Sequence, residues 1–152
     1  MGILMNDDQI KAGSGGEFPS YDDLRLGDSA SMGLLVSGAL VEKYAALIGD
    51  TNPVHLDDEF AAKSFFHRRV AHGMIAAGLI SAVLGTRLPG PGAIYLNQSL
   101  DFKRPVYLDE TIQAKVEITE LFDKHKKVTF RTWVENSSGQ VVLDGQAQVL
   151  VR

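Results

Sequence analysis

The most regular feature of the chain is an alternation of apolar and polar residues in its C-terminal half. Every second position from 112 to 118 is apolar, and residues 128–134 repeat the pattern. A period of two is typical of a strand with one buried face. Residues 136–139, Asn-Ser-Ser-Gly, predict a hairpin turn before a last strand over 141–151, and 94–103 predicts the first strand of the series. Tight turns between neighbouring strands predict an antiparallel sheet.

A second feature is a segment without charged residues, 73–84, in which Ser81 carries the only hydroxyl group. A helix that is apolar on all sides must be enclosed by the rest of the protein. Gly78 within it favours close approach of another backbone, and Gly85 supplies its end. One such helix, followed by an antiparallel sheet with one apolar face, predicts an α+β fold in which the sheet wraps around the helix.

Weaker patterns precede this helix. Residues 30–36 can form a strand. Apolar residues within 41–48 recur at the spacing of an amphipathic helix, and Gly49 provides the flexible stop that often follows one. One member of the Asp57-Asp58 pair can cap a second short helix that continues to Phe65.

Length and composition limit the possible classes of protein. The 152 residues suffice for one domain, which we expect over 19–152 after an N-terminal arm over 1–18. The Gly-Ser-Gly-Gly sequence at 13–16 makes this arm either unstructured or a cloning remnant. A net charge of −4 argues against nucleic-acid binding, and the lack of cysteine excludes disulfides. No apolar run approaches the roughly 18 residues of a membrane span and no signal-peptide pattern is present, so we expect a cytoplasmic protein.

The strongest candidates for chemistry are Asp50 and His55, an acid and an imidazole five residues apart. Together they can hold one water molecule and accept its proton, because the imidazole pKa lies near neutrality. Spacing alone leaves a structural alternative open. In that alternative Asp50 caps the helix end or the Asn52-Pro53 turn, and His55 is an interior histidine.

The His72-Gly73 pair that opens the apolar helix is a further candidate. The first turn of a helix offers backbone N–H groups without partners, and a glycine there lets a substrate oxygen come close. Such a donor can form an oxyanion hole, typically worth about 10²–10³ in rate. Alternatively the glycine serves packing alone. Ser81, eight residues along, either bonds to its own backbone or contacts a substrate.

Other kinds of site find little support in the sequence. The histidines lack a cysteine partner and no H-E-x-x-H pattern occurs, so we expect no metal. The motifs of P-loop, dinucleotide-binding and serine-hydrolase sites are absent. Six further basic side chains are expected to be solvated: His67, Arg68, Arg69, Lys103, Arg104 and His125. Of these, the three arginines and Lys103 could also bind phosphate groups.

Several segments, taken in order, form a long motif: Tyr44-Ala45, Gly49-Asp50-x-Asn52-Pro53-x-His55-x-Asp57, Phe60-Ala61, Phe66, Val70-x-His72-Gly73-Met74, Leu88-Pro89-Gly90-Pro91-Gly92 and Ser99-Leu100-Asp101-Phe102-Lys103-Arg104-Pro105-Val106. This motif resembles that of the MaoC-like (R)-specific enoyl-CoA hydratases, the hydratase-2 group, over roughly Tyr21 to Val151. The connector at 66–69 departs from the glycine-containing form common in that group.

The resemblance implies a hot-dog fold, in which a curved antiparallel sheet wraps a long central helix, and a homodimer. It also implies reversible hydration of a trans-2-enoyl-CoA to an (R)-3-hydroxyacyl-CoA without metal or redox cofactor. By position, Asp50 and His55 match the catalytic pair and Gly73 matches the N–H donor to the thioester oxygen. Ser81 matches a hydroxyl near the active site, and Asn52 lies in the signature loop.

Two other activities fit the same resemblance in part. One is hydrolysis of acyl thioesters on a hot-dog fold, and the other is a dimer that binds acyl-CoA without turnover. The acyl-chain length and the pathway stay open, with storage-polyester supply, fatty-acid oxidation and a role beside an acyl-phosphate enzyme as the alternatives.

Overall fold

A computed structural model describes residues 20–152, so the arm predicted over 1–18 lies outside the described residues. In order, the elements are a 3₁₀ turn η1 (Tyr21–Asp23), β1 (Ser29–Val36), α1 (Gly38–Ile48), α2 (Pro53–Leu56), α3 (Asp58–Lys63), α4 (Gly73–Thr86), β2 (Ile94–Phe102), β3 (Glu110–Phe122), β4 (Lys127–Glu135) and β5 (Val141–Leu150). The strands predicted from the apolar alternation are all present, and the weakly patterned segment near residue 30 is a strand too.

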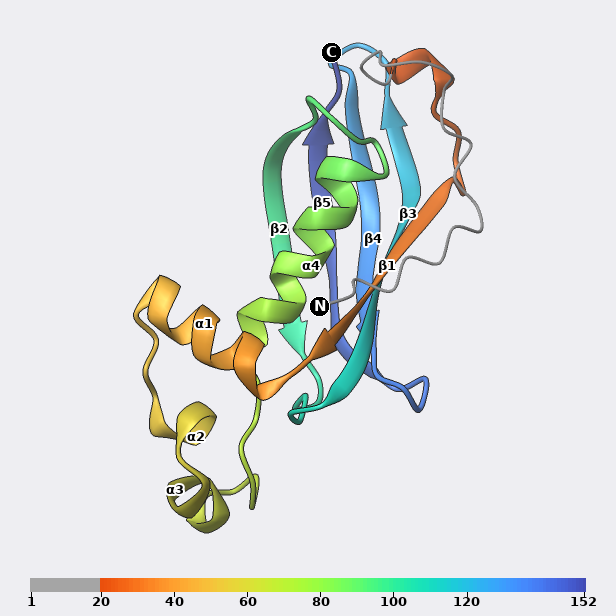
Figure 1. Cartoon of the computed structure of the whole chain (residues 1–152). Helices are drawn as coiled ribbons and strands as arrows, with labels where there is room; N and C mark the ends of the chain where they lie inside the picture. Colours follow the sequence, from red (N-terminus) through yellow and green to blue (C-terminus); the bar gives the residue numbers. More distant parts are fainter. Residues whose placement is uncertain (1–19) are drawn as a thin grey trace.

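The five strands form one antiparallel sheet in the order β1-β3-β4-β5-β2, so β1 and β2 are its two edges. The sheet curves around α4, which lies along its concave face (Figure 1). This confirms the expected α+β architecture of a hot-dog fold. The inward residues of β3 and β4 are buried while their neighbours are partly exposed, which is the physical origin of the period of two in the sequence.

The core fills the space between α4 and the sheet. Phe130 of β4, Ile112 and Ile118 of β3, and Ile80 of α4 are at most 1% exposed. Burying an apolar side chain of this size stabilises a fold by about 1.5–3 kcal/mol relative to leaving it in water. The sheet therefore fixes α4 in place through one side of the helix. The buried α4 residues are Ile75, Ala76, Ala77, Leu79, Ile80, Val83 and Leu84.

The prediction that α4 is enclosed on all sides is wrong for the single chain. Met74, Gly78, Ser81 and Gly85 are exposed along one side of the helix. Within residues 20–152, nothing outside the helix lies within 4 Å of where a Cβ would stand at Gly78, so the backbone approach expected there is not found in this part of the chain. The composition of the helix shows that it has no charged face. It does not show how much of the helix surface the rest of the described chain buries. The helix also continues past Gly85 to Thr86.

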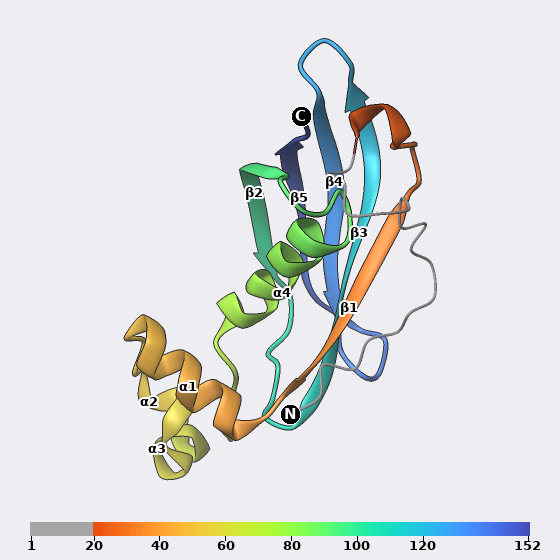
Figure 2. The same ribbon diagram turned by 45° about the horizontal axis from the view of Figure 1, so that its top comes forward.

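The helices α1, α2 and α3 form an overhang beyond the N-terminal end of α4 (Figures 1 and 2). Gly49 ends α1 in the left-handed conformation, with φ of 86°, as its position predicted. Asp57 caps α3 by accepting a hydrogen bond from the Phe60 N–H, but α3 ends at Lys63 rather than at Phe65. Within residues 20–152, no helix is long and apolar enough to span a membrane.

Candidate active site

The loop after α1 is shaped by two short side-chain contacts. The Asn52 N–H donates to Oδ1 of Asp50 at 3.3 Å, and the Val54 N–H donates to Oδ1 of Asn52 at 3.2 Å. Asn52 is thereby the N-cap of α2, and Pro53 occupies its first turn, where the missing N–H of proline costs nothing. Asp50 does support the turn, as the structural alternative proposed, but this contact uses only one of its two oxygens.

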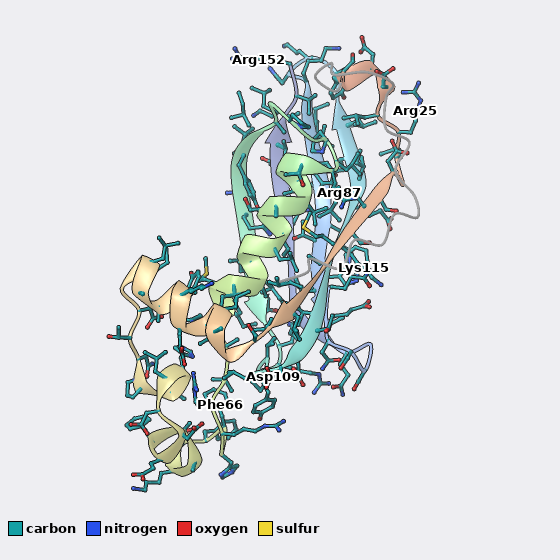
Figure 3. The ribbon with its side chains drawn as sticks, viewed as in Figure 1. Arg25, Phe66, Arg87, Asp109, Lys115 and Arg152 are labelled. Carbon is teal, nitrogen blue, oxygen red and sulfur yellow. The ribbon has the colours of Figure 1, made fainter. Side chains whose placement is uncertain are left out.

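His55 lies in α2 rather than in an open loop, and its ring is held in one orientation. Its Nδ1 lies 2.7 Å from the carbonyl oxygen of Val70, in the connector between α3 and α4. A carbonyl only accepts hydrogen bonds, so Nδ1 carries the proton and Nε2 keeps a free lone pair. The backbone of His55 is held as well, because Nε of Arg69 donates to its carbonyl at 2.7 Å. The connector, marked by Phe66 in Figure 3, thus presents His55 as a base through Nε2.

The structure brings the acid and the imidazole together. The carboxylate of Asp50 and one ring nitrogen each of His55 and His72 lie within 4.8 Å of one another. Asp50 is exposed, His55 is half-buried and His72 is buried. An exposed carboxylate beside a partly enclosed imidazole can hold one water molecule between them and take up its proton.

Burial lowers the pKa of His55 below its ordinary value. The hydrogen bond to Val70 and, to a smaller extent, the charge of Asp50 raise the pKa of His55, while the neighbouring His72 lowers it further. The lowered pKa favours the neutral form of the His55 ring, which is the protonation state that a general base requires.

Gly73 is the first residue of α4, and its N–H has no acceptor among the described residues. The N-cap position, His72, makes no side-chain cap to the helix, so this end of α4 stays open to a ligand. The ring of Phe102, at the end of β2, lies against Gly73: a Cβ there would stand 2.7 Å from one ring carbon. Glycine is therefore required for the present position of the ring, and it also leaves the amide accessible.

An open apolar groove of about 380 Å³ begins at this end of α4. Tyr44, Met74 and Ile75 line it near the histidines, and the rest of its lining is apolar except for Lys43. The further lining residues are Leu34, Leu40, Leu47, Gly78, Leu79 and Ala82. A groove of this polarity suits a hydrocarbon chain.

Two other candidates from the sequence, Ser81 and Asn52, are not part of this cluster. Ser81 lies eight residues after Gly73, about 12 Å along the helix axis, and is exposed, with no hydrogen bond found within residues 20–152. Its expected contact with a substrate stays a prediction. Asn52 caps α2, so the contact found for it is structural.

Three residues of the site have roles that their sequence positions did not predict. Arg69 was expected to be solvated, but it is largely buried and holds the His55 backbone. Tyr44 was quoted only as part of a motif, and His72 only as the neighbour of Gly73, without a role for its side chain. Their rings are 4.8 Å apart, and His72 lies beside His55. A histidine directly before the helix glycine was the one available signal for His72.

The three clustered side chains are of types that bind metals, but their geometry favours acid–base chemistry. The rings of His55 and His72 lie against one another, with centroids 3.8 Å apart and planes tilted by 31°. One nitrogen of each ring already faces a backbone carbonyl, that of Val70 for His55 and that of Asp50 for His72, so each ring has only one nitrogen left for other chemistry. The expectation that the site needs no metal stays a prediction.

Comparison with known proteins agrees with the fold. Residues 29–139 match the family model described as MaoC like domain, and the chain belongs to this family. It is 49% identical over 131 residues to the (R)-specific enoyl-CoA hydratase of Rhodospirillum rubrum, covering 86% of this chain and 90% of the relative. It is 43% identical over 131 residues to the 3-hydroxybutyryl-CoA dehydratase of Methylorubrum extorquens, covering 86% and 83%.

A solved structure gives the same result. The (R)-hydratase of Aeromonas caviae, described as involved in PHA biosynthesis, superimposes with a TM-score of 0.83 at 40% identity, covering 86% of this chain and 98% of that one. The resemblance seen in the sequence motifs therefore extends over most of the fold.

Proposed function

We infer that the protein is an (R)-specific enoyl-CoA hydratase, which reversibly adds water to a trans-2-enoyl-CoA to give an (R)-3-hydroxyacyl-CoA. The observation that carries this inference is the meeting of Asp50 and His55 beside the open N-terminus of α4. Relatives of this name at more than 40% identity support it. The reaction adds H and OH across a C=C bond without oxidation or reduction overall, so the scheme requires no redox cofactor.

In the proposed mechanism, the thioester carbonyl oxygen accepts a hydrogen bond from the Gly73 N–H. Asp50 and His55 hold a water molecule on one face of the double bond. As the water oxygen bonds to C3, one of the pair takes its proton and negative charge develops on the thioester oxygen, where the helix N-terminus stabilises it. The protonated group then delivers a proton to C2 from the same face, which makes the addition syn.

The acyl chain is proposed to lie in the groove between α1 and α4. The apolar lining from Tyr44 to Ala82 starts next to the reacting atoms and contains one charged residue, Lys43. Coenzyme A enters as part of the substrate. A supply of hydroxyacyl-CoA for polyester synthesis fits the role described for the A. caviae relative.

The active form is proposed to be a homodimer in the cytoplasm. The edge strand β2 is unpaired on one side within residues 20–152 and exposes Ile94, Tyr95 and Leu96, which are 40–44% exposed. A nine-residue edge strand that starts with three exposed apolar side chains is unusual on a protein that works alone. Pairing of β2 with its copy would cover this edge.

One assay separates this function from the alternatives. The protein is mixed with crotonyl-CoA, and both the conjugated-enoyl absorbance and free thiol are followed. Loss of absorbance without thiol release, with (R)-3-hydroxybutyryl-CoA as product, is expected. Thiol release would indicate a thioesterase, and binding without either change would indicate an acyl-CoA-binding protein; each of these results would reject the hydratase.

A further inference from the structure

We propose that His72 is a positioning residue that holds the acid, the base and the oxyanion donor of the active site in one geometry. It contacts all three parts of the proposed machinery, while the mechanism assigns it no proton transfer. The inference rests on the proposed function for its kinetic test and on the structure alone for its contacts.

The first contact is with the residue that carries the acid. Nε2 of His72 lies 2.9 Å from the backbone carbonyl oxygen of Asp50, across 22 positions of sequence. Since the carbonyl can only accept, Nε2 carries the proton and donates. This hydrogen bond ties the loop after α1 to the start of α4, and with it the Cα from which the Asp50 carboxylate projects.

The second contact is with the base. The His72 ring lies against the His55 ring at a centroid distance of 3.8 Å, and the Tyr44 ring of α1 lies 4.8 Å away on a plane tilted by 56°. The hydrogen bond of Nδ1 to Val70 fixes one edge of the His55 ring. The ring of His72 restricts tilting of the same ring, so the direction of the Nε2 lone pair is determined by both.

The third contact is through the backbone. His72 is the N-cap of α4, its carbonyl accepts the Ile75 N–H at 3.1 Å, and the next residue is Gly73. A shift of His72 therefore moves the amide that is proposed to meet the thioester oxygen. This one residue therefore determines how Asp50, His55 and Gly73 are placed relative to one another.

A purely structural role does not explain why this residue is a histidine. His72 is 3% exposed, and its Nδ1 is buried without a hydrogen-bond partner among residues 20–152. A buried polar atom without a partner is a cost that phenylalanine in the same space would avoid. What phenylalanine lacks is the Nε2–H donor to Asp50.

Two substitutions separate the donor from the ring. His72→Phe keeps a ring between Tyr44 and His55 but removes the donor, whereas His72→Gln has an amide N–H near the Nε2 position but no ring. His125→Gln, in the exposed β3–β4 turn, is the matched control and should retain wild-type activity. All variants are assayed with crotonyl-CoA, and the dissociation constant of butyryl-CoA, a saturated and unreactive ligand, measures binding.

We expect His72→Phe to lower kcat about 10²-fold, the cost of a misplacement near 1 Å, with butyryl-CoA affinity changed less than about 3-fold. His72→Gln should recover about 10-fold of that loss because it keeps the tether to Asp50. Wild-type kcat in His72→Phe, no recovery in a folded His72→Gln, or a loss seen in binding instead of kcat would overturn the inference. If His72→Phe does not fold, the test uses His72→Gln, with its kcat and its butyryl-CoA affinity measured relative to those of His125→Gln. A lower kcat with unchanged affinity supports the positioning role, and a kcat equal to that of His125→Gln overturns it.

A second readout does not depend on activity. The His55 ring is titrated by NMR in wild type and in His72→Gln, where removal of the second imidazole should raise the His55 pKa. Among residues 20–152, the other charged or titratable groups found against His55 or His72 are Asp50, Arg69 with its ion-pair partner Glu42, and Tyr44, and none of them is changed. An unshifted titration would show that the two rings are not coupled. If wild type does not hydrate crotonyl-CoA, the proposed function fails, and this titration still decides the positioning role.

Discussion

Replacing Gly73 by alanine tests whether the start of α4 serves as an oxyanion donor. The added methyl carbon would stand 2.7 and 3.0 Å from two ring carbons of Phe102. The Phe102 residue is 53% exposed, so its ring can rotate toward solvent and relieve the clash. Alanine in place of glycine favours the helix by up to about 1 kcal/mol. The free energy of unfolding should therefore change by less than about 1 kcal/mol.

Activity should respond far more strongly than stability. The methyl group, together with the displaced ring, occupies the approach to the Gly73 amide. Losing one oxyanion-hole donor typically lowers kcat about 10²–10³-fold, or about 2.7–4 kcal/mol of transition-state stabilisation. We expect a loss in this range for Gly73→Ala at saturating crotonyl-CoA. Gly38→Ala is the control, because Gly38 is also the first residue of a helix and its Cβ would make an ordinary contact of 3.6 Å with Leu108.

The double variant Gly73→Ala/Phe102→Ala decides between the two reasons for glycine. If glycine is needed only to accommodate the ring, removing the ring restores the rate of Phe102→Ala alone. If the amide must be approached closely by the substrate, the double variant stays well below Phe102→Ala. Full restoration would refute the oxyanion assignment of Gly73.

Three further predictions follow from the same geometry. The lowered pKa of His55 extends the range in which it is a neutral base toward lower pH, so the acid limb of kcat/KM should lie below pH 6.5, the ordinary value for histidine; a limb at or above this value would contradict the prediction. Hydration in D₂O should place deuterium at C2 and oxygen at C3 on the same face, as NMR of the product would show, and anti addition would mean that the two groups act from opposite sides. Leu96→Lys should shift the protein from dimer to monomer in light scattering; an unchanged dimer would show that the β2 edge is not the interface.

The sheet and the central helix could be predicted because burial leaves a periodic mark on the sequence. Residues 112–118 alternate since one face of β3 packs against α4. The charge-free segment over 73–84 is a helix for the same reason. This pattern could not predict how much of the surface of α4 the sheet covers. An apolar side of a helix has the same composition whether it is buried or faces solvent in the single chain.

The site could be predicted only in part, since several of its contacts run to backbone carbonyls. Side-chain types suggested Asp50 and His55. The acceptors that orient the rings, the carbonyls of Val70 and Asp50, have no sequence signature, because every residue has a carbonyl group. Arg69 shows the same limit: its guanidinium was expected in solvent, but it holds the His55 carbonyl instead.

The central claim is that Asp50 and His55 together activate the water that adds to the double bond. The most direct measurement compares crotonyl-CoA hydration by wild type, Asp50→Asn and His55→Asn at equal concentrations of folded protein. In His55→Asn the side-chain amide can still donate to the Val70 carbonyl. The hydrogen bond that holds the side chain is therefore kept, while the basic ring nitrogen is lost. Each substitution is predicted to lower kcat at least about 10²-fold, as expected for a lost acid–base group. Near-normal hydration by either folded variant would contradict the claim.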